Sequence, residues 1–331
     1  MQVPSESTRP ERCYVPAVSE RPEPVRTRVA ELLGVDYPII QAPMGYIARA
    51  QLASAVSNAG ALGIIETSSG MLDDVRVEIA NMRDLTDKPF GVNIAQLFVR
   101  DPSIVDFVVD NGVRFVTTSA GDPTRFTTQL KEAGLTVFHV VPSLGAALKA
   151  IAAGVDGLVV EGGEGGGFKN PRDVSTMVLL PLVCAKADVP IVAAGGISDG
   201  ISMAAAFALG AEGVQMGTRM VSALESPIHE NWKQAIIAAD EQSTVFLNRH
   251  SRPGLRVLRT ERSTRLERQD HVGGEDFGDM MALYFGGDME AFIAFAGQVA
   301  GRIDAIEPVD EIITRTVDEF RETARRMAVF G

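Results

Sequence analysis

Cysteine, long apolar runs and metal-ligand spacings are all scarce in this sequence. Of its 331 residues only Cys13 and Cys184 are cysteines, so a disulfide framework or a cysteine metal site is not expected. No stretch reaches the roughly 18 apolar residues of a membrane span, and the polar N-terminus does not resemble a signal peptide. HxxxH, CxxC and paired-carboxylate spacings are also missing. We therefore expect a cytoplasmic protein with no metal site and no membrane segment.

Positive charge is in short supply as well. The net charge of -12 argues against a general nucleic-acid or membrane-surface role, because those partners repel an acidic protein. One stretch, residues 249–268, is an exception, and it contains Arg249, Arg252, Arg256, Arg259, Arg262, Arg265 and Arg268. It is either a solvated face paired with carboxylates or a site for the phosphates of coenzyme A or a pyridine nucleotide.

What the sequence does contain is a regular alternation of short apolar runs and helix-length segments. The eight runs cover residues 37–42, 61–65, 90–94, 114–119, 136–141, 157–160, 191–194 and 213–216, and helices are predicted between them, for example at 48–58, 103–111, 143–153 and 200–209. This pattern predicts an α/β fold in which eight parallel strands close into a TIM (β/α)8 barrel over residues 27–239.

The two ends of the chain lack this rhythm. Residues 1–26 combine prolines with mixed charge and are expected to form a disordered tail. Residues 240–331 are predicted to be a helical appendage or lid over the barrel mouth, with helices at 276–285, 289–302 and 309–327.

Glycines close the last two apolar runs. Gly195-Gly196 follows the run at 191–194, and Gly217 with Thr218 follows the run at 213–216. Barrels of this class often bind phosphate in the loops after strands seven and eight, and a missing Cβ lets backbone N–H groups approach a phosphate closely. The other predicted strand ends offer few acids or bases. This favours a phosphate-bearing cofactor with its own reactivity, such as FMN.

Several ordered motifs resemble the nitronate monooxygenase (2-nitropropane dioxygenase) family, which includes FMN-dependent enoyl reductases. They are QAPM at 41–44, DKPFGVNI at 87–94, AAGGI at 193–197, QMGTR at 215–219 and the pair Gly297-Gln298. The resemblance implies FMN as cofactor, with NAD(P)H as a candidate electron donor. The flavin contacts it implies are Ala42, Pro43, Met44, Asn93, Glu161, Gly166, Gly167, Ala194, Gly195, Gly196, Met216, Gly217 and Thr218. Arg256 and Gln298 are predicted to bind the substrate or an anion.

One position departs from the family. Its members usually carry a histidine after the glycine run, whereas this chain has Phe168 followed by Lys169. A neutral nitroalkane needs a base to remove its α-proton, but a pre-formed nitronate does not. Phe168 can stack beside the flavin or a thioester chain while Lys169 or a water supplies the proton. His139, in the fifth predicted strand, is either a core residue or a third catalytic contact.

Two functions stay open. The first is FMN-dependent oxidation of an anionic, nitronate-like substrate with O₂. The alternative is NAD(P)H-dependent reduction, or the reverse dehydrogenation, of an enoyl thioester of acyl carrier protein or coenzyme A, which the motif at 87–94 favours. A flavin-free lyase or isomerase and a non-catalytic ligand-binding barrel are weaker alternatives, the former because its lysine or carboxylate pair is missing. The expected partner is a small molecule or an acyl thioester, and a homodimer is compatible with the sequence.

Overall fold

Eight parallel strands form the centre of the computed structural model, which describes residues 21–69 and 71–330. They are β1 (Ile39–Gln41), β2 (Gly63–Glu66), β3 (Phe90–Ala95), β4 (Phe115–Ser119), β5 (Thr136–Val141), β6 (Gly157–Glu161), β8 (Ile191–Ala194) and β9 (Gly213–Met216). The sheet order is β1-β9-β8-β6-β5-β4-β3-β2, and a parallel bridge between Ile40 and Leu62 brings β1 to β2. The predicted TIM-like barrel of eight strands is therefore confirmed.

Large rings fill the barrel interior because glycines leave room for them. Phe115 and Phe138 are both buried and meet edge to face, with ring centroids 5.2 Å apart. A Cβ on Gly91 would lie 2.6 Å from the Phe115 ring, and a Cβ on Gly157 would lie 2.4 Å from the Phe138 ring. Any larger residue at either glycine would force the ring to move.

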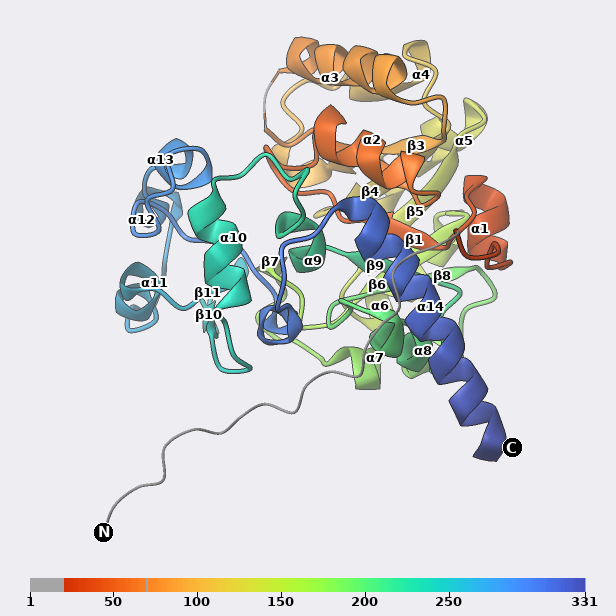
Figure 1. Ribbon diagram of the computed structural model, residues 1–331. Coiled ribbons are helices and arrows are strands. Elements are labelled where there is room, and N and C mark those ends of the chain that lie inside the picture. The colour runs from red at the N-terminus through yellow and green to blue at the C-terminus, as the bar shows by residue number, and fades with distance from the viewer. Residues whose placement is uncertain (1–20, 70, 331) are drawn as a thin grey trace.

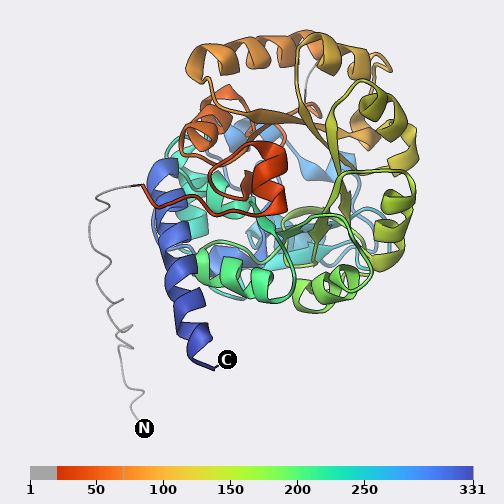
Figure 2. The same cartoon turned by 90° about the vertical axis from the view of Figure 1, so that its right-hand side faces the viewer.

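Helices surround the strands (Figures 1 and 2). They are α1 (Arg28–Leu33), α2 (Ala50–Asn58), α3 (Leu72–Leu85), α4 (Ile104–Asp110), α5 (Thr127–Glu132), α6 (Leu144–Ala152), α7 (Thr176–Cys184) and α8 (Gly200–Ala208), with 3-10 turns η1 (Gln96–Phe98) and η2 (Pro123–Arg125). The predicted helices at 48–58, 103–111, 143–153 and 200–209 correspond to α2, α4, α6 and α8. None of the helices in the described part of the chain is long and apolar enough to cross a bilayer.

The predicted N-terminal tail lies mostly outside the described residues. Its last part, residues 21–26, packs on the barrel: Val25 N donates to Asp36 O at 2.8 Å, and the Tyr37 hydroxyl donates to Pro22 O at 2.6 Å. For these residues the expectation of disorder is corrected, because the segment is hydrogen-bonded to Asp36 and Tyr37, just before β1.

A long insertion follows β9. It contains α9 (Thr218–Val221), α10 (Glu230–Ile237), β10 (Thr244–Leu247), β11 (Gly254–Leu258), α11 (Glu261–Leu266), α12 (Gly274–Phe277), α13 (Met280–Tyr284) and η3 (Gln298–Arg302). β10 and β11 form an antiparallel sheet with β7 (Gly167–Lys169), which continues the glycine run after β6. The predicted helical appendage therefore also contains a small antiparallel sheet.

Two of the predicted helices in this insertion differ from the structure. The helix at 276–285 is split at Gly278, whose φ is +95° and whose Cβ would overlap Ala291 O at 2.0 Å. The helix at 289–302 is replaced by an irregular segment that ends in η3. In that segment Phe292 and Phe295 form β-bridges with Gly278 and Val257, so its backbone pairs across the insertion instead of along a helix.

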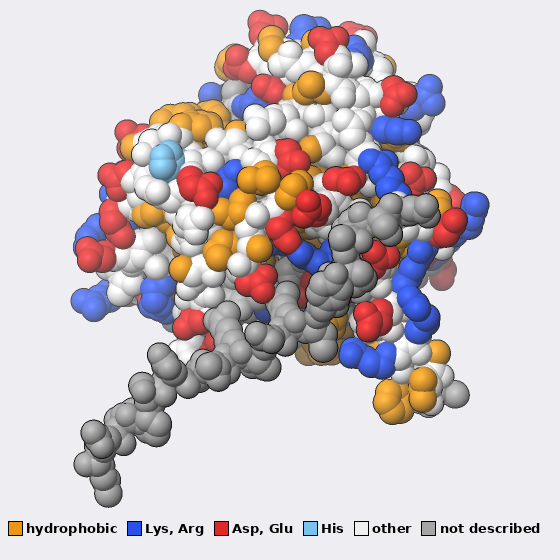
Figure 3. Space-filling view, in the orientation of Figure 1, with side chains coloured by type: hydrophobic (Ala, Val, Ile, Leu, Met, Phe, Trp, Pro, Cys, Tyr) orange, Lys and Arg blue, Asp and Glu red, His pale blue; other side chains and the backbone are white. Residues whose placement is uncertain are grey.

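The last predicted helix, 309–327, is present as α14 (Val309–Met327), followed by η4 (Ala328–Phe330). It packs against α8 and α2 and so lies in the outer ring, not over the barrel mouth (Figure 1). Gly200 at the start of α8 allows this contact, because its Cβ would lie 2.2 Å from Phe320 N. The end of α14 projects from the body, and Val329 and Phe330 are exposed there (Figure 3).

Candidate functional site

A cavity of about 1240 Å³ lies at the carboxyl ends of the barrel strands, under residues of the insertion. It exceeds the roughly 300–1,000 Å³ of a typical small-molecule site. It brings together all but three of the predicted site residues: Ala42, Pro43, Met44, Asn93, His139, Glu161, Gly166, Gly167, Phe168, Lys169, Ala194, Gly195, Gly196, Gly217 and Thr218.

The remaining three, Met216, Gln298 and Arg256, are not among the cavity-lining residues. Met216 is buried in the core and Gln298 is exposed. Arg256 donates from Nε to Gly163 O at 2.8 Å, pairs with Asp173 at 3.5 Å and is buried, which lowers the pKa of its guanidinium. Arg256 thus ties the glycine loop to β11.

Glycines form one end of the cavity. Gly195 and Gly196 have φ values of +86° and +82°, and Thr176 Oγ1 donates to Gly195 O at 2.8 Å. A Cβ on Gly196 or Gly217 would meet no atom closer than 3.5 Å. The N–H groups of these two residues have no protein acceptor within the described chain.

An unpaired side-chain atom lies at the same end. Gln215 lines the cavity, and its Oε1 is buried with no hydrogen-bond partner among the described residues. Free backbone N–H groups suit a phosphate, and an orphaned amide oxygen suits a polar ligand edge with a donor. Together these groups fit a phosphate-bearing cofactor such as FMN.

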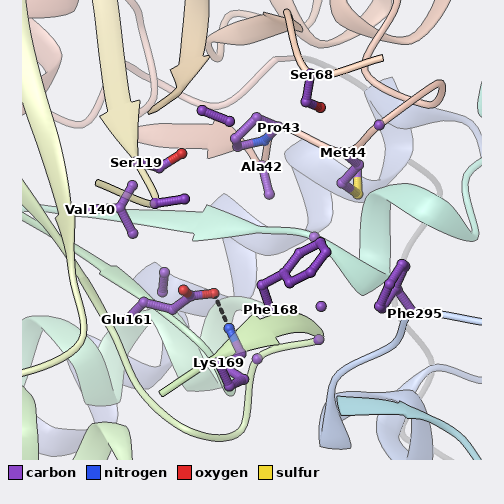
Figure 4. A pocket seen from close by; sticks show the side chains of 18 of the residues that line it. Ala42, Pro43, Met44, Ser68, Ser119, Val140, Glu161, Phe168, Lys169 and Phe295 are labelled. Carbon is purple, nitrogen blue, oxygen red and sulfur yellow. Dashed lines mark hydrogen bonds and ion pairs between the residues drawn. The ribbon is translucent and has the colours of Figure 1, made fainter. Parts of the chain in front are cut away.

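Residues 42–44, which follow β1, line the cavity beside Gly217 (Figure 4). Buried Glu66, at the end of β2, holds this segment: its carboxylate accepts from Tyr46 N at 3.1 Å and Ser68 N at 2.7 Å and pairs with Arg49 at 3.2 Å. Tyr46 has a φ of 60°, which is unfavourable for a residue with a side chain. The Glu66 bonds compensate for that backbone conformation and fix the loop that carries Met44.

Lys169 and Glu161 form an ion pair in the cavity wall (Figure 4). The Lys169 side chain is only 4% exposed, and its Nζ donates to Glu161 Oε1. A Cβ on Gly165 would lie 2.8 Å from that Nζ, so the glycine leaves room for the amine in its present position. β7 pairs with β11 through Lys169 and Gly254, which fixes the backbone of this lysine.

His139 lines the cavity from β5 and is almost fully buried. Its Nδ1 is 2.7 Å from Thr118 Oγ1, and burial lowers the pKa of the imidazole to about 4. It is therefore neutral at pH 7. In that state it can orient a ligand by a hydrogen bond but carries no charge.

Phe168 occupies the position where the family resemblance leads us to expect a histidine. Its side chain is 40% exposed, and its ring centroid lies 5.6 Å from that of Phe98 and 5.7 Å from that of Phe295. Figure 4 shows Phe168 and Phe295 side by side in the cavity. An apolar surface thus stands where a base was expected.

Two arginines line the cavity: Arg100, which the sequence analysis missed, and Arg252, which belongs to the basic stretch at 249–268. Arg100 and Arg252 are both exposed at the cavity, and no ion pair or hydrogen bond is recorded for either side chain in the described structure. Of the seven arginines at 249–268 only Arg252 lines the cavity. Arg259 pairs with Glu267 at 3.3 Å, and Arg262 donates to Asp276 O at 2.9 Å, so part of the stretch is engaged within the protein. The described residues contain no His, Cys, Asp and Glu cluster able to hold a metal.

Comparison with known proteins decides the family. The sequence model of nitronate monooxygenase matches residues 26–104 and 95–319. The chain belongs to this family. A carboxyl-CoA dehydrogenase of Mycobacterium tuberculosis, named for a 5-hydroxy-7a-methyl-1-oxo-octahydro-1H-indene-4-carboxyl-CoA substrate, is 39% identical over 76% of this chain and 71% of its own length. A nitronate monooxygenase of Paraburkholderia phytofirmans is 32% identical over 65% of this chain and 71% of its own length.

Solved structures agree with this family assignment. The structure of FabK from Thermotoga maritima matches with a TM-score of 0.87 and 39% identity over 93% of this chain and 100% of that chain. A nitroalkane oxidase from Streptomyces ansochromogenes matches with a TM-score of 0.77 and 24% identity over 90% of this chain and 99% of that one, which supports the fold alone. The protein is thus an oxidoreductase of the nitronate monooxygenase family, and membership implies a flavin, FMN.

Proposed function

We propose that this protein is an FMN-dependent oxidoreductase that interconverts saturated and α,β-unsaturated acyl thioesters of coenzyme A. The relatives support a thioester: a carboxyl-CoA dehydrogenase is 39% identical, whereas the nitronate monooxygenase from Paraburkholderia phytofirmans is 32% identical. The observation that carries the proposal is the pairing of an apolar Phe168 with a buried, ion-paired Lys169 in the cavity wall.

The reaction requires a proton carrier and a hydride carrier. Dehydrogenation removes a proton from the α-carbon and a hydride from the β-carbon, and reduction adds both. FMN, when bound, supplies the two-electron chemistry. Lys169 Nζ takes or gives the α-proton, and the Glu161 carboxylate orients that amine and balances its charge.

Other residues hold the reactants. The free N–H groups of Gly196 and Gly217 bind the cofactor phosphate, and Asn93 presents a fixed amide, since its Nδ2 donates to Thr117 Oγ1 at 2.9 Å. Neutral His139 orients polar groups without adding charge. Phe168 excludes water from the reacting carbons.

The cavity is large enough for the thioester, and its lining carries positive charge that suits the phosphates of coenzyme A. Its volume of about 1240 Å³ is more than a small nitronate beside a flavin needs. Arg100 and Arg252 supply positive charge among its lining residues, which suits the phosphates of coenzyme A on a chain whose net charge is -12.

Anaerobic flavin spectroscopy tests this function. The purified holoenzyme is mixed with NADPH without O₂, and an enoyl-CoA is then added. We expect NADPH to bleach the flavin absorbance and the enoyl-CoA to restore it with formation of the saturated thioester. Restoration by O₂ but by no enoyl-CoA, together with bleaching by a nitronate alone, would overturn the proposal.

The second candidate is oxidation of a pre-formed nitronate with O₂. It is favoured by the nitronate monooxygenase relatives and by the absence of any need for a base at residue 168. The same spectroscopic experiment separates the two functions, because only this second one predicts bleaching by a nitronate.

A further inference from the structure

Three neighbouring helices of the outer ring carry almost no charge. Each of α6, α7 and α8 has nine residues, and Lys149 is the only charged residue among them. Its ammonium lies at the cavity and is paired with Asp122 at 2.6 Å. By contrast, α3 has six charged residues among its 14. On a chain in which 22% of the residues are charged, this uncharged part of the outer ring calls for an explanation.

The outer sides of these helices present large apolar side chains to the solvent. The middle helix, α7, is apolar on every side: Leu179, Leu180 and Val183 are buried, and the opposite side is apolar and exposed. A helix that is hydrophobic all round is normally buried on all sides. The exposed side chains, which we call the apolar face, are Leu148 of α6, Met177, Val178 and Leu182 of α7, and Ile201 of α8.

The residues of the apolar face lie on helices that follow one another round the barrel. α6 contacts α7, and the end of α8 reaches α7, since a Cβ on Gly210 would lie 2.9 Å from Cys184 Cβ. Figures 1 and 2 both show α7 beside α8, with α14 on the other side of α8. Among the described residues, no element covers the outer side of α7, because Met177, Val178 and Leu182 are each at least half exposed.

We propose that the apolar face is the contact surface of a homodimer, in which two copies of this chain pack α7 against α7 around a twofold axis. Such an axis places the same surface on both partners, so the surface must be compatible with itself. Apolar side chains meet this condition, whereas a charged surface would meet its own sign. The dimer goes beyond the thioester function and does not depend on it.

The charge of the chain favours a second copy as the occupant of this face. Two copies with a net charge of -12 each repel one another, and the apolar face lets them approach without placing like charges in contact. Homodimer interfaces are more apolar than transient ones, and charged residues are depleted in their cores. Residues 1–20 of the chain itself are a poorer occupant, because five of them are charged and three are proline.

The size of the apolar face also fits a dimer. Its five side chains present roughly 500 Å² of apolar surface per copy, which is more than half of the ~800 Å² that each partner buries in a stable interface. Ala152 of α6 and Ala205 of α8 are exposed on the same helices and add uncharged surface. The three helices together therefore supply enough area for a stable contact.

Sedimentation of the holoenzyme at micromolar concentration tests the dimer. The wild type is expected to have about twice the 35.4 kDa mass of the chain. Val178→Glu should raise the dimer dissociation constant at least ~100-fold, because the carboxylate of each copy would be buried without a partner. Val77→Glu is the matched control and should leave the dimer intact: Val77 of α3 is 58% exposed, against 52% for Val178, but lies outside the apolar face.

Flavin content and urea unfolding report whether the variants fold, and hydrogen exchange of the wild type locates the interface without any substitution. Dilution below the dissociation constant should speed amide exchange in α7 and leave α3 unchanged, and this measurement decides if Val178→Glu does not fold. A monomeric wild type, with its apolar face bare or covered by residues 1–20, would overturn the proposal. So would a dimer that persists in folded Val178→Glu, or one whose dilution changes exchange only outside α6, α7 and α8.

Discussion

The two ends of the cavity are built differently. At the barrel end, backbone groups of Gly195, Gly196 and Gly217 form the surface, and short local motifs determine their conformation. At the insertion end, side chains such as Phe277, Met280 and Phe295 line the cavity, and they meet only through tertiary packing. In the proposed function this arrangement separates cofactor binding from substrate choice, because the side chains of the insertion can change without altering the glycine turns of the barrel.

The largest expected effect is on FMN binding, and it comes from placing a negative charge at the glycine end of the cavity. A Cβ at Gly217 would lie 3.5 Å from Ala42 Cβ, an ordinary contact, so Gly217→Ala is the tolerated control. Gly217→Asp adds a carboxylate beside the phosphate and should weaken FMN binding at least ~100-fold, or about 3 kcal/mol. Flavin absorbance of the purified variants and calorimetric titration measure this. Full flavin retention by Gly217→Asp would show that the phosphate binds elsewhere.

Removing the buried amine of Lys169 should lower the catalytic rate without weakening flavin binding. Lys169→Met is expected to lower kcat by roughly 10²–10⁴-fold with unchanged flavin content, because the α-proton loses its carrier. Lys149→Met is the control, since Lys149 lies at the cavity but pairs with Asp122 at 2.6 Å. Steady-state kinetics on an enoyl-CoA give the comparison, and a kcat for Lys169→Met within about twofold of wild type would exclude Lys169 as that carrier.

The pH dependence of the free energy of unfolding tests whether His139 is neutral in the folded protein. The pKa of His139 is lowered by burial from 6.5 to about 4, so between these values the unfolded state binds a proton that the folded state does not. The free energy of unfolding should therefore fall by about 3 kcal/mol as the pH drops from 6.5 to 4, with no contribution above that range.

His139→Gln should remove this part of the pH dependence, and the exposed His271→Gln should not. Urea unfolding at pH 7 and pH 4.5 measures the difference. Equal slopes in wild type and His139→Gln would mean that the imidazole is already charged in the folded protein at the lower pH.

The smallest expected effect is on KM, and it comes from replacing the exposed Arg252. Arg252→Ala should raise KM for a coenzyme A thioester by about three- to tenfold at low salt, and less at high salt, because exposed charge contacts are weak and screened. Arg265→Ala, an exposed arginine that does not line the cavity, is the control. If both variants raise KM equally, the effect reflects the overall charge of the protein and not a contact made by Arg252.

The sequence predicts the barrel end far better than the insertion. Apolar runs, glycine caps and turn glycines act locally, so strand positions and the Gly195-Gly196 turn follow from them directly. The apolar segment at 289–302 has helical composition, but bridges from Phe292 to Gly278 and from Phe295 to Val257 override it. Arg256 stands in a basic stretch, yet it is buried because its partner is Gly163 O, 93 positions away in the chain. Contacts between residues so far apart in the chain leave no pattern in the local sequence.

The position of α14 constrains how the cavity can open. The insertion starts at α9, directly after β9, and returns to α14, which packs on α8 and α2 and seats Phe320 against Phe207 at 4.8 Å. The insertion is thus attached to the barrel at both of its ends, through β9 before it and through α14 after it. Because it is held at both ends, we expect the insertion to move less than a cover attached by a single hinge.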